Sequence, residues 1–138
     1  MFSFSTESSE KALVGAVFLG GERVFYEAES LGLREDHFSK PGNRLLWAVF
    51  RDGLEGGVKP DVGMIYERHE RDIVKFGGFS WLSSFSGACG SIHHVPSYVD
   101  RVIAGHRRAK ILHAARLALE AGKSPDNTAA DIHALLEG

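Results

Sequence analysis

Residues 96–121 read PSYVDRVIAGHRRAKILHAARLALEA, and this stretch decides the fold. Its proline stands in what would be the first turn of a helix, where proline is tolerated, and Gly122 follows as a stop signal. The stretch therefore predicts one long helix. Apolar or small residues recur on two stripes of this helix, which are Val102, Ala109, Leu112 and Leu119, and Ala104, Ile111, Ala115 and Ala118. Two such faces predict packing on two sides, against the domain's own core and against another helix.

The residues after Gly122 predict a shorter helix that returns beside the first. Lys-Ser-Pro-Asp-Asn at 123–127 is a turn sequence, and Thr128 with Asp131 resembles a capping box. The apolar face of the helix that follows consists of Ile132, Leu135 and Leu136. Residues 96–138 are therefore expected to form an antiparallel helical hairpin.

Residues 1–95 show helical rather than alternating apolar spacing, and no segment favours a strand. A helix led by Pro41 is expected to use Ser39 as its cap, and Asp61 is expected to cap the next helix. A short helix between glycine pairs carries Phe79, Leu82 and Phe85. The chain is thus predicted to be all-α, a compact bundle of about six helices with a C-terminal hairpin. Residues 1–95 would form a globular helical part and residues 96–138 the hairpin, within one structural domain.

The composition excludes several classes of protein. The chain has 138 residues, 43% of them hydrophobic, and a formal net charge of −2, which fits one globular domain rather than a disordered chain or a strongly basic nucleic-acid binder. A single cysteine, Cys89, excludes an intramolecular disulfide and fits a reducing compartment. No apolar run approaches the roughly 20 residues that span a bilayer, and the N-terminal residues lack a signal-peptide pattern. We expect a cytoplasmic protein without membrane association.

The glycine-rich segment from Lys75 to Val95 resembles a chemical site but does not satisfy the requirements of one. No G-x-x-x-x-G-K-[ST] motif occurs in the chain, so a nucleotide-binding P-loop is not expected. Cys89 with His93 and His94 is an incomplete zinc set, even with His106 and His113 added. No group is evident that would orient a Cys-His pair for catalysis. We therefore expect no catalytic residue, no metal and no cofactor, and no enzyme activity from this chain.

One charge feature remains. Five basic residues lie on the long helix with no acidic residue between the first and the last; they are Arg101, Arg107, Arg108, Lys110 and Arg116. They form either a solvated helix face or a docking surface for an acidic or phosphate-bearing partner. A further alternative is a DNA-binding helical domain that uses residues 101–116. The net charge of −2 and the lack of an aromatic row beside the arginines count against it.

The order of several short motifs resembles the N-terminal domain of DnaB-type replicative DNA helicases over nearly the whole chain. The matching elements are Leu13-Val14-Gly15, Leu33 to Phe38, Arg44-Leu45-Leu46-Trp47, Gly57 to Asp61, Gly77-Gly78-Phe79-Ser80-Trp81-Leu82, and Tyr98 to Val102 with Arg107 and Arg108 beyond. The chain departs from the family at Asn43-Arg44, where many relatives have a histidine, and at His94, where an asparagine is common. It also contains no ATPase motor, so a free-standing phage or plasmid accessory protein that binds or regulates the helicase is the alternative.

The resemblance implies an interaction module that pairs through its hairpin and receives primase or a helicase loader during DNA replication. DNA would be contacted only indirectly, through the parent helicase. An exposed apolar stripe has reason to pair, because wet apolar surface costs about 25 cal/mol per Å². We expect a dimer, with twofold symmetry as the default, or a higher homo-oligomer. The expected self-association residues are Val102, Ala109, Leu112, Leu119, Ile132, Leu135 and Leu136, and the expected partner-docking residues are Arg101, Arg107, Arg108, Lys110 and Arg116.

Overall fold

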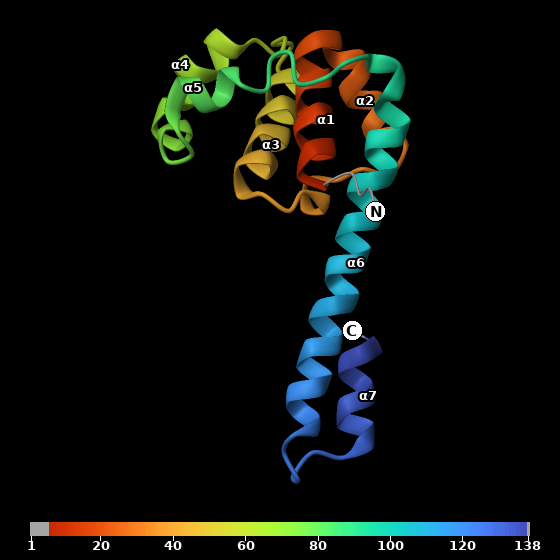
Figure 1. Ribbon diagram of the computed structural model, residues 1–138. Coiled ribbons are helices and arrows are strands. Elements are labelled where there is room, and N and C mark those ends of the chain that lie inside the picture. Colours follow the sequence, from red (N-terminus) through yellow and green to blue (C-terminus); the bar gives the residue numbers. More distant parts are fainter. Residues whose placement is uncertain (1–5, 138) are drawn as a thin grey trace. The chain divides into compact units, whose positions relative to one another are not determined.

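The computed structural model describes residues 6–137, and within this range every regular element is helical (Figure 1). The α-helices are α1 (Thr6–Gly20), α2 (Glu22–Ser30), α3 (Pro41–Glu55), α4 (Val62–Val74), α5 (Gly78–Ser83), α6 (Val95–Gly122) and α7 (Ala129–Glu137). Two short 3₁₀ segments are η1 (Glu35–His37) and η2 (Ile92–His94). The predicted all-α fold with a C-terminal hairpin is confirmed.

The chain divides into two compact units, the first reaching to Ile103 and the second beginning at Ala104. This division lies inside α6 and differs from the predicted one after residue 95. The reason is that Val95, Val99 and Val102 follow one another at helical spacing and are fully buried in the core of the first unit. The opening turns of α6 therefore belong to the globular part rather than to the hairpin.

The core of the first unit is built around α1, which lies between α2 and α3 (Figure 1). Its centre is aromatic. Phe25 of α2 stacks on Trp47 of α3 with ring centroids 4.8 Å apart, and Phe38 lies 5.2 Å from the same indole. All three side chains are buried. Such aromatic contacts add roughly 0.5–1.5 kcal/mol each to the burial of the rings.

A buried carboxylate joins α1 to the start of α3. The Glu10 side chain is fully buried and accepts hydrogen bonds from the Ser39 N–H at 2.9 Å, the Ser39 hydroxyl at 2.6 Å and the Asn43 amide at 2.9 Å. The Lys40 N–H approaches it at 3.4 Å. A negative charge at a helix N-terminus is also favoured by the helix dipole. Glu10 therefore acts as an N-terminal cap of α3, although it lies about 30 residues earlier in the chain.

This arrangement corrects one predicted cap and leaves another in place. The residue at the N-cap of α3 is Lys40, whose side chain makes no capping hydrogen bond, and the Ser39 side chain donates to Glu10 instead of capping the helix. The expected cap of α4 is confirmed, because the Asp61 carboxylate accepts from the Met64 N–H at 2.9 Å. In α5, Leu82 is buried as expected, but Phe79 is 50% exposed and is not a core residue.

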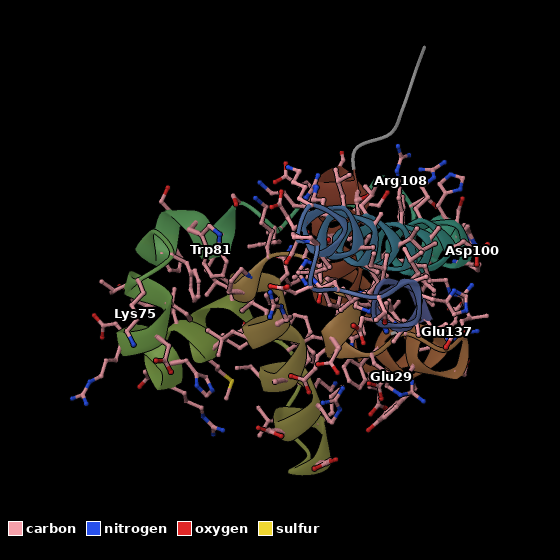
Figure 2. All side chains as sticks on the ribbon, turned by 90° about the horizontal axis from the view of Figure 1, so that it is seen from below. Glu29, Lys75, Trp81, Asp100, Arg108 and Glu137 are labelled. Atoms are coloured by element: carbon pink, nitrogen blue, oxygen red, sulfur yellow. The ribbon has the colours of Figure 1, made fainter. Side chains whose placement is uncertain are left out.

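Two helical glycines allow close approach between elements of the first unit. A Cβ on Gly15 of α1 would lie 2.5 Å from the Phe85 carbonyl oxygen and 3.2 Å from the Cys89 nitrogen. A Cβ on Gly42 of α3 would lie 2.5 Å from Cζ2 of Trp81, and Figure 2 shows Trp81 on the side of α5 that faces α3. The segment after α4 therefore packs against α1 and α3 at two positions where any added side chain would force its neighbours to shift.

An ion-pair network closes the other side of this core. The Arg51 guanidinium donates to Glu29 and to Glu35, both at 2.7 Å, and so connects α3 with α2 and η1. The Trp47 indole N–H approaches Glu29 at 3.4 Å. The hydrogen bond to Glu29, followed by that to Glu35, raises the pKa of Arg51 against the opposing effect of burial.

We predict that Glu10→Gln lowers the free energy of unfolding by about 3 kcal/mol, since hydrogen bonds to a charged acceptor are worth about 1.5–3 kcal/mol each. The amide NH₂ of the glutamine would also face the N–H of Ser39 and the amide NH₂ of Asn43, which are donors and cannot accept a hydrogen bond from it. Urea unfolding followed by tryptophan fluorescence measures this, because Trp47 and Trp81 both lie in the first unit. Glu7→Gln is the control, because its carboxylate pairs with Lys40 on the surface and its loss should leave stability nearly unchanged. Equal effects of the two variants would contradict the role of Glu10.

A second prediction compares two glycines inside helices. Gly15→Ala should destabilise the first unit by about 1–3 kcal/mol, because the added methyl meets backbone that cannot move aside. Gly53→Ala in α3 should instead stabilise it by about 0.5–1 kcal/mol, because its Cβ would meet nothing closer than the Val58 carbonyl oxygen at 3.6 Å. The urea midpoints of the two variants should move in opposite directions, and a shift of both in the same direction would contradict the packing described here.

Candidate functional site

The second unit is a hairpin in which α7 lies antiparallel beside the C-terminal half of α6 (Figure 1). The turn is fixed locally. The Asn127 side-chain amide donates to the Ala121 carbonyl at 2.8 Å, close to the end of α6. The predicted capping box is confirmed, since the Thr128 N–H donates to the Asp131 carboxylate at 3.0 Å and the Asp131 N–H donates to the Thr128 hydroxyl at 3.2 Å. Hydrogen bonding from the Thr128 backbone, and then from its side chain, lowers the pKa of Asp131.

The contact between the two helices of the hairpin is narrow. Small residues line it on α6, where Ala118 is buried and Ala114 and Ala121 are half-buried. On α7, Ile132 and Leu135 are half-buried, and a Cβ on Gly122 would lie 3.7 Å from the Ile132 side chain. Ala118 is the one buried residue among positions 104–137. The hairpin therefore buries little apolar surface by itself.

Large apolar side chains remain exposed on this unit. Their exposed fractions are 68% for Ile111, 44% for Leu112, 43% for Leu117, 65% for Leu119 and 54% for Leu136. Leu112 and Leu119 are seven residues apart and share one side of α6, with Ile111 on the adjoining side. We call Ile111, Leu112 and Leu119 the apolar stripe of α6. Clusters of this kind on a surface mark interaction sites.

The predicted self-association residues are distributed differently from the expectation. The prediction that Val102 takes part in self-association is wrong, because its side chain is fully buried in the core of the first unit. Ala109, Leu112, Leu119 and Leu136 are exposed, whereas Ile132 and Leu135 are half-buried on the side of α7 toward α6. Ile111 and Leu117 were not among the predicted residues. Ile111 and Leu117 could have been found from the sequence by selecting the large apolar residues of α6 that do not lie on its alanine-lined side.

The five basic residues do not form one cluster. Arg101 belongs to the first unit, where it is half-buried and lines a cavity of about 330 Å³ with His94, Tyr98 and three serines. The other four are exposed on the second unit, and Figure 2 shows Arg108 directed away from the helix axis. Neighbouring positions point about 100° apart on a helix, so Arg107 and Lys110 share one side and Arg108 and Arg116 another. Such a spread is less favourable to binding along one DNA backbone than a single basic stripe would be.

The cysteine and histidines considered as metal ligands or catalytic residues do not form a site in the part of the chain that the structure describes. Cys89 is buried in the core of the first unit, and His93 and His94 are exposed in η2. Within residues 6–137, no three His, Cys, Asp or Glu side chains are grouped as metal ligands would be. No helix in the same range combines the length and the apolar character needed to cross a bilayer.

Two comparisons with known proteins agree with this architecture. The family model of the DnaB-like helicase N-terminal domain matches residues 4–104. The solved N-terminal domain of DnaB helicase from Mycobacterium tuberculosis is similar in fold, with a TM-score of 0.81, 14% identity and 95% of each chain covered. No curated protein matches the chain.

A second solved structure is described as a DnaB-like replicative helicase and its interactions with primase. It is similar at a TM-score of 0.67 and 19% identity, covering 94% of this chain and 31% of the other. The chain thus spans about a third of that helicase's length. The match of the family model covers well over half of the 138 residues. The chain belongs to the family of DnaB-like helicase N-terminal domains.

Proposed function

We propose that this domain is a non-catalytic interaction module of a replicative helicase. It self-associates through its helical hairpin and docks primase or a helicase loader during DNA replication. Family membership supports the setting, and a structurally similar helicase is described with its interactions with primase. The assignment to a dimer or a higher homo-oligomer, and the residues that make each contact, are parts of the proposal.

The exposed apolar stripe on α6 is the observation that carries the proposal. Ile111, Leu112 and Leu119 are each between 44% and 68% exposed, on a unit in which Ala118 is the only buried residue among positions 104–137. Two helices in contact through alanine side chains are marginally stable in water, because most helical stability in proteins comes from tertiary packing. A second copy that covers the stripe would supply that packing.

The geometry favours pairing of like surfaces. Leu112 and Leu119 stand two turns apart on one side of α6, the spacing at which two helices place apolar side chains between each other. A twofold axis would bring each copy's stripe against the same stripe of its partner. Leu136 of α7 is also exposed and would extend the covered area.

Partner docking is assigned to the exposed basic residues of α6. Two of them, Arg108 and Arg116, are each four residues from Leu112 and so flank the stripe. Arg107, Arg108, Lys110 and Arg116 are exposed on the second unit and form no ion pair with another described residue. Guanidinium groups in this state are available to carboxylates on a partner, which they bind through two parallel hydrogen bonds. Arg101 is not included, because it lines a cavity of the first unit.

We predict that the double variant Leu112→Ser, Leu119→Ser is monomeric at concentrations where the unmodified chain is associated. Each buried leucine contributes about 1.5–3 kcal/mol, so the loss should weaken association at least about a hundredfold. Sedimentation velocity over a concentration series measures it, and circular dichroism checks that helicity is retained.

The matched control is Leu31→Ser. Leu31 is 46% exposed, almost the same fraction as Leu112, but it follows α2 in the first unit. The control should sediment like the unmodified chain. A hairpin variant that stays associated, or an unmodified chain that is monomeric throughout, would contradict the proposal.

We further predict that Arg107→Ala combined with Arg108→Ala weakens binding to the cognate primase by about tenfold at low salt and leaves the fold intact. A lost hydrogen bond to a charged group costs about 1.5–3 kcal/mol at most, and less on an exposed surface. Isothermal titration with purified primase measures this loss. The control, Arg23→Ala with Arg71→Ala, removes the same charge from the first unit. An equal loss in both variants would show a non-specific charge effect and would contradict docking at α6.

A further inference from the structure

A cavity of about 520 Å³ opens between the second half of α3 and the first half of α4. This volume lies within the range of about 300–1,000 Å³ that is usual for binding pockets. Its floor is apolar and well packed, with Phe50 and Ile65 buried beneath it. Val58 and Pro60 of the intervening loop form one wall, and Met64, which is 41% exposed, stands at the opening. All residues that line the cavity belong to the first unit.

Polar groups are found at the rim of this cavity rather than at its floor. Lys59, Arg68 and His69 line it together with a single carboxylate, Asp52. Neither Lys59 nor Arg68 forms a hydrogen bond or ion pair through its side chain with any residue in the described part of the chain. Both are exposed. Two unpaired cations beside an apolar cavity favour an occupant that has an apolar part and a nearby negative charge.

The helix α4 is interrupted at this site. His69 has φ −123° and ψ 21°, outside the helical region, although the helix continues on both sides. Kinks of this kind have local causes and change the direction of the turns beyond them. Arg68 and His69 lie at the kink and line the cavity, whereas Arg71, one turn further along, does not.

We propose that this cavity is a docking site for a segment of another protein that inserts apolar side chains beside a carboxylate. Apolar side chains of the segment occupy the space over Phe50 and Ile65, and its carboxylate pairs with Arg68, assisted by Lys59. Met64 at the opening is unbranched and polarisable, which suits a surface that adapts to a peptide.

The charges at the rim select a peptide over a nucleic acid. Asp52 also lines the cavity, and its charge repels a run of closely spaced phosphates more than it repels a single carboxylate. The apolar floor has no side-chain hydrogen-bond donor for the phosphates or sugars of a nucleic acid. No lining residue belongs to the hairpin, so the proposal does not rest on the proposed self-association.

Three synthetic peptides test the proposal: ELLFE, the charge-reversed KLLFK, and ESSSE, which lacks apolar side chains. Each is titrated into the ¹⁵N-labelled full chain. ELLFE is expected to shift the amides of Gly53, Val58 and Met64, and to bind at least tenfold more tightly than either of the others. Equal binding of KLLFK, shifts confined to other residues, or no binding of ELLFE would overturn the proposal, as would tighter binding of oligo(dT) at the same amides.

A matched pair of variants tests the charge. Arg68 and Arg71 are both exposed arginines of α4, but only Arg68 lines the cavity. Arg68→Glu should weaken ELLFE at least fivefold, and Arg71→Glu less than twofold. The Leu112→Ser, Leu119→Ser variant should bind ELLFE as the unmodified chain does. An equal loss in the two arginine variants would overturn the assignment of the carboxylate to Arg68.

Discussion

The buried carboxylate of Glu10 sets the position of α3, and the rest of the first unit depends on that position. Its hydrogen bonds to Ser39 and Asn43 fix where α3 begins relative to α1. The start of the helix in turn determines that Trp47 and Phe50 reach the aromatic core and that Gly42 lies beneath Trp81. Because a buried charge is stable only when it is fully hydrogen-bonded, this junction tolerates few alternatives. Two helices and the segment containing α5 are thereby located by one side chain.

Much of the fold was predictable from the sequence, because its signals are local. Helical spacing, Pro41, Asp61 and the Thr128–Asp131 capping box all act within one or two turns, and each is found as expected. The junction at Glu10 was not predictable, since its partners lie about 30 residues away and a glutamate in an amphipathic helix is usually solvated. For the same reason Ser39 was misassigned as a cap. Phe79 was misplaced because a helix as short as α5 has too few turns to define a buried face.

The interaction surface was predictable only in outline. The sequence indicates that α6 has apolar residues on more than one side, but the partner of each side depends on where the globular part ends. Val102 packs in the core of the first unit, and the alanines of α6 pack against α7. Ile111, Leu112 and Leu119 therefore remain uncovered. The cavity between α3 and α4 gave no sequence signal, because its lining comes from two helices and a loop whose individual residues look like ordinary core and surface.

The sharing of α6 between the two units has a consequence for how the hairpin forms. Starting a helix is the unfavourable step, whereas each further residue adds one hydrogen bond to an existing turn. Val95, Val99 and Val102 hold the first turns of α6 in the core, so the part of the helix beyond Ala104 extends from a nucleus that the first unit has already provided. With nine residues, α7 is too short to be stable alone, and it can condense only on a helix that is already present. The hairpin is therefore expected to form late in folding and to fray first, from its turn and from α7 inward.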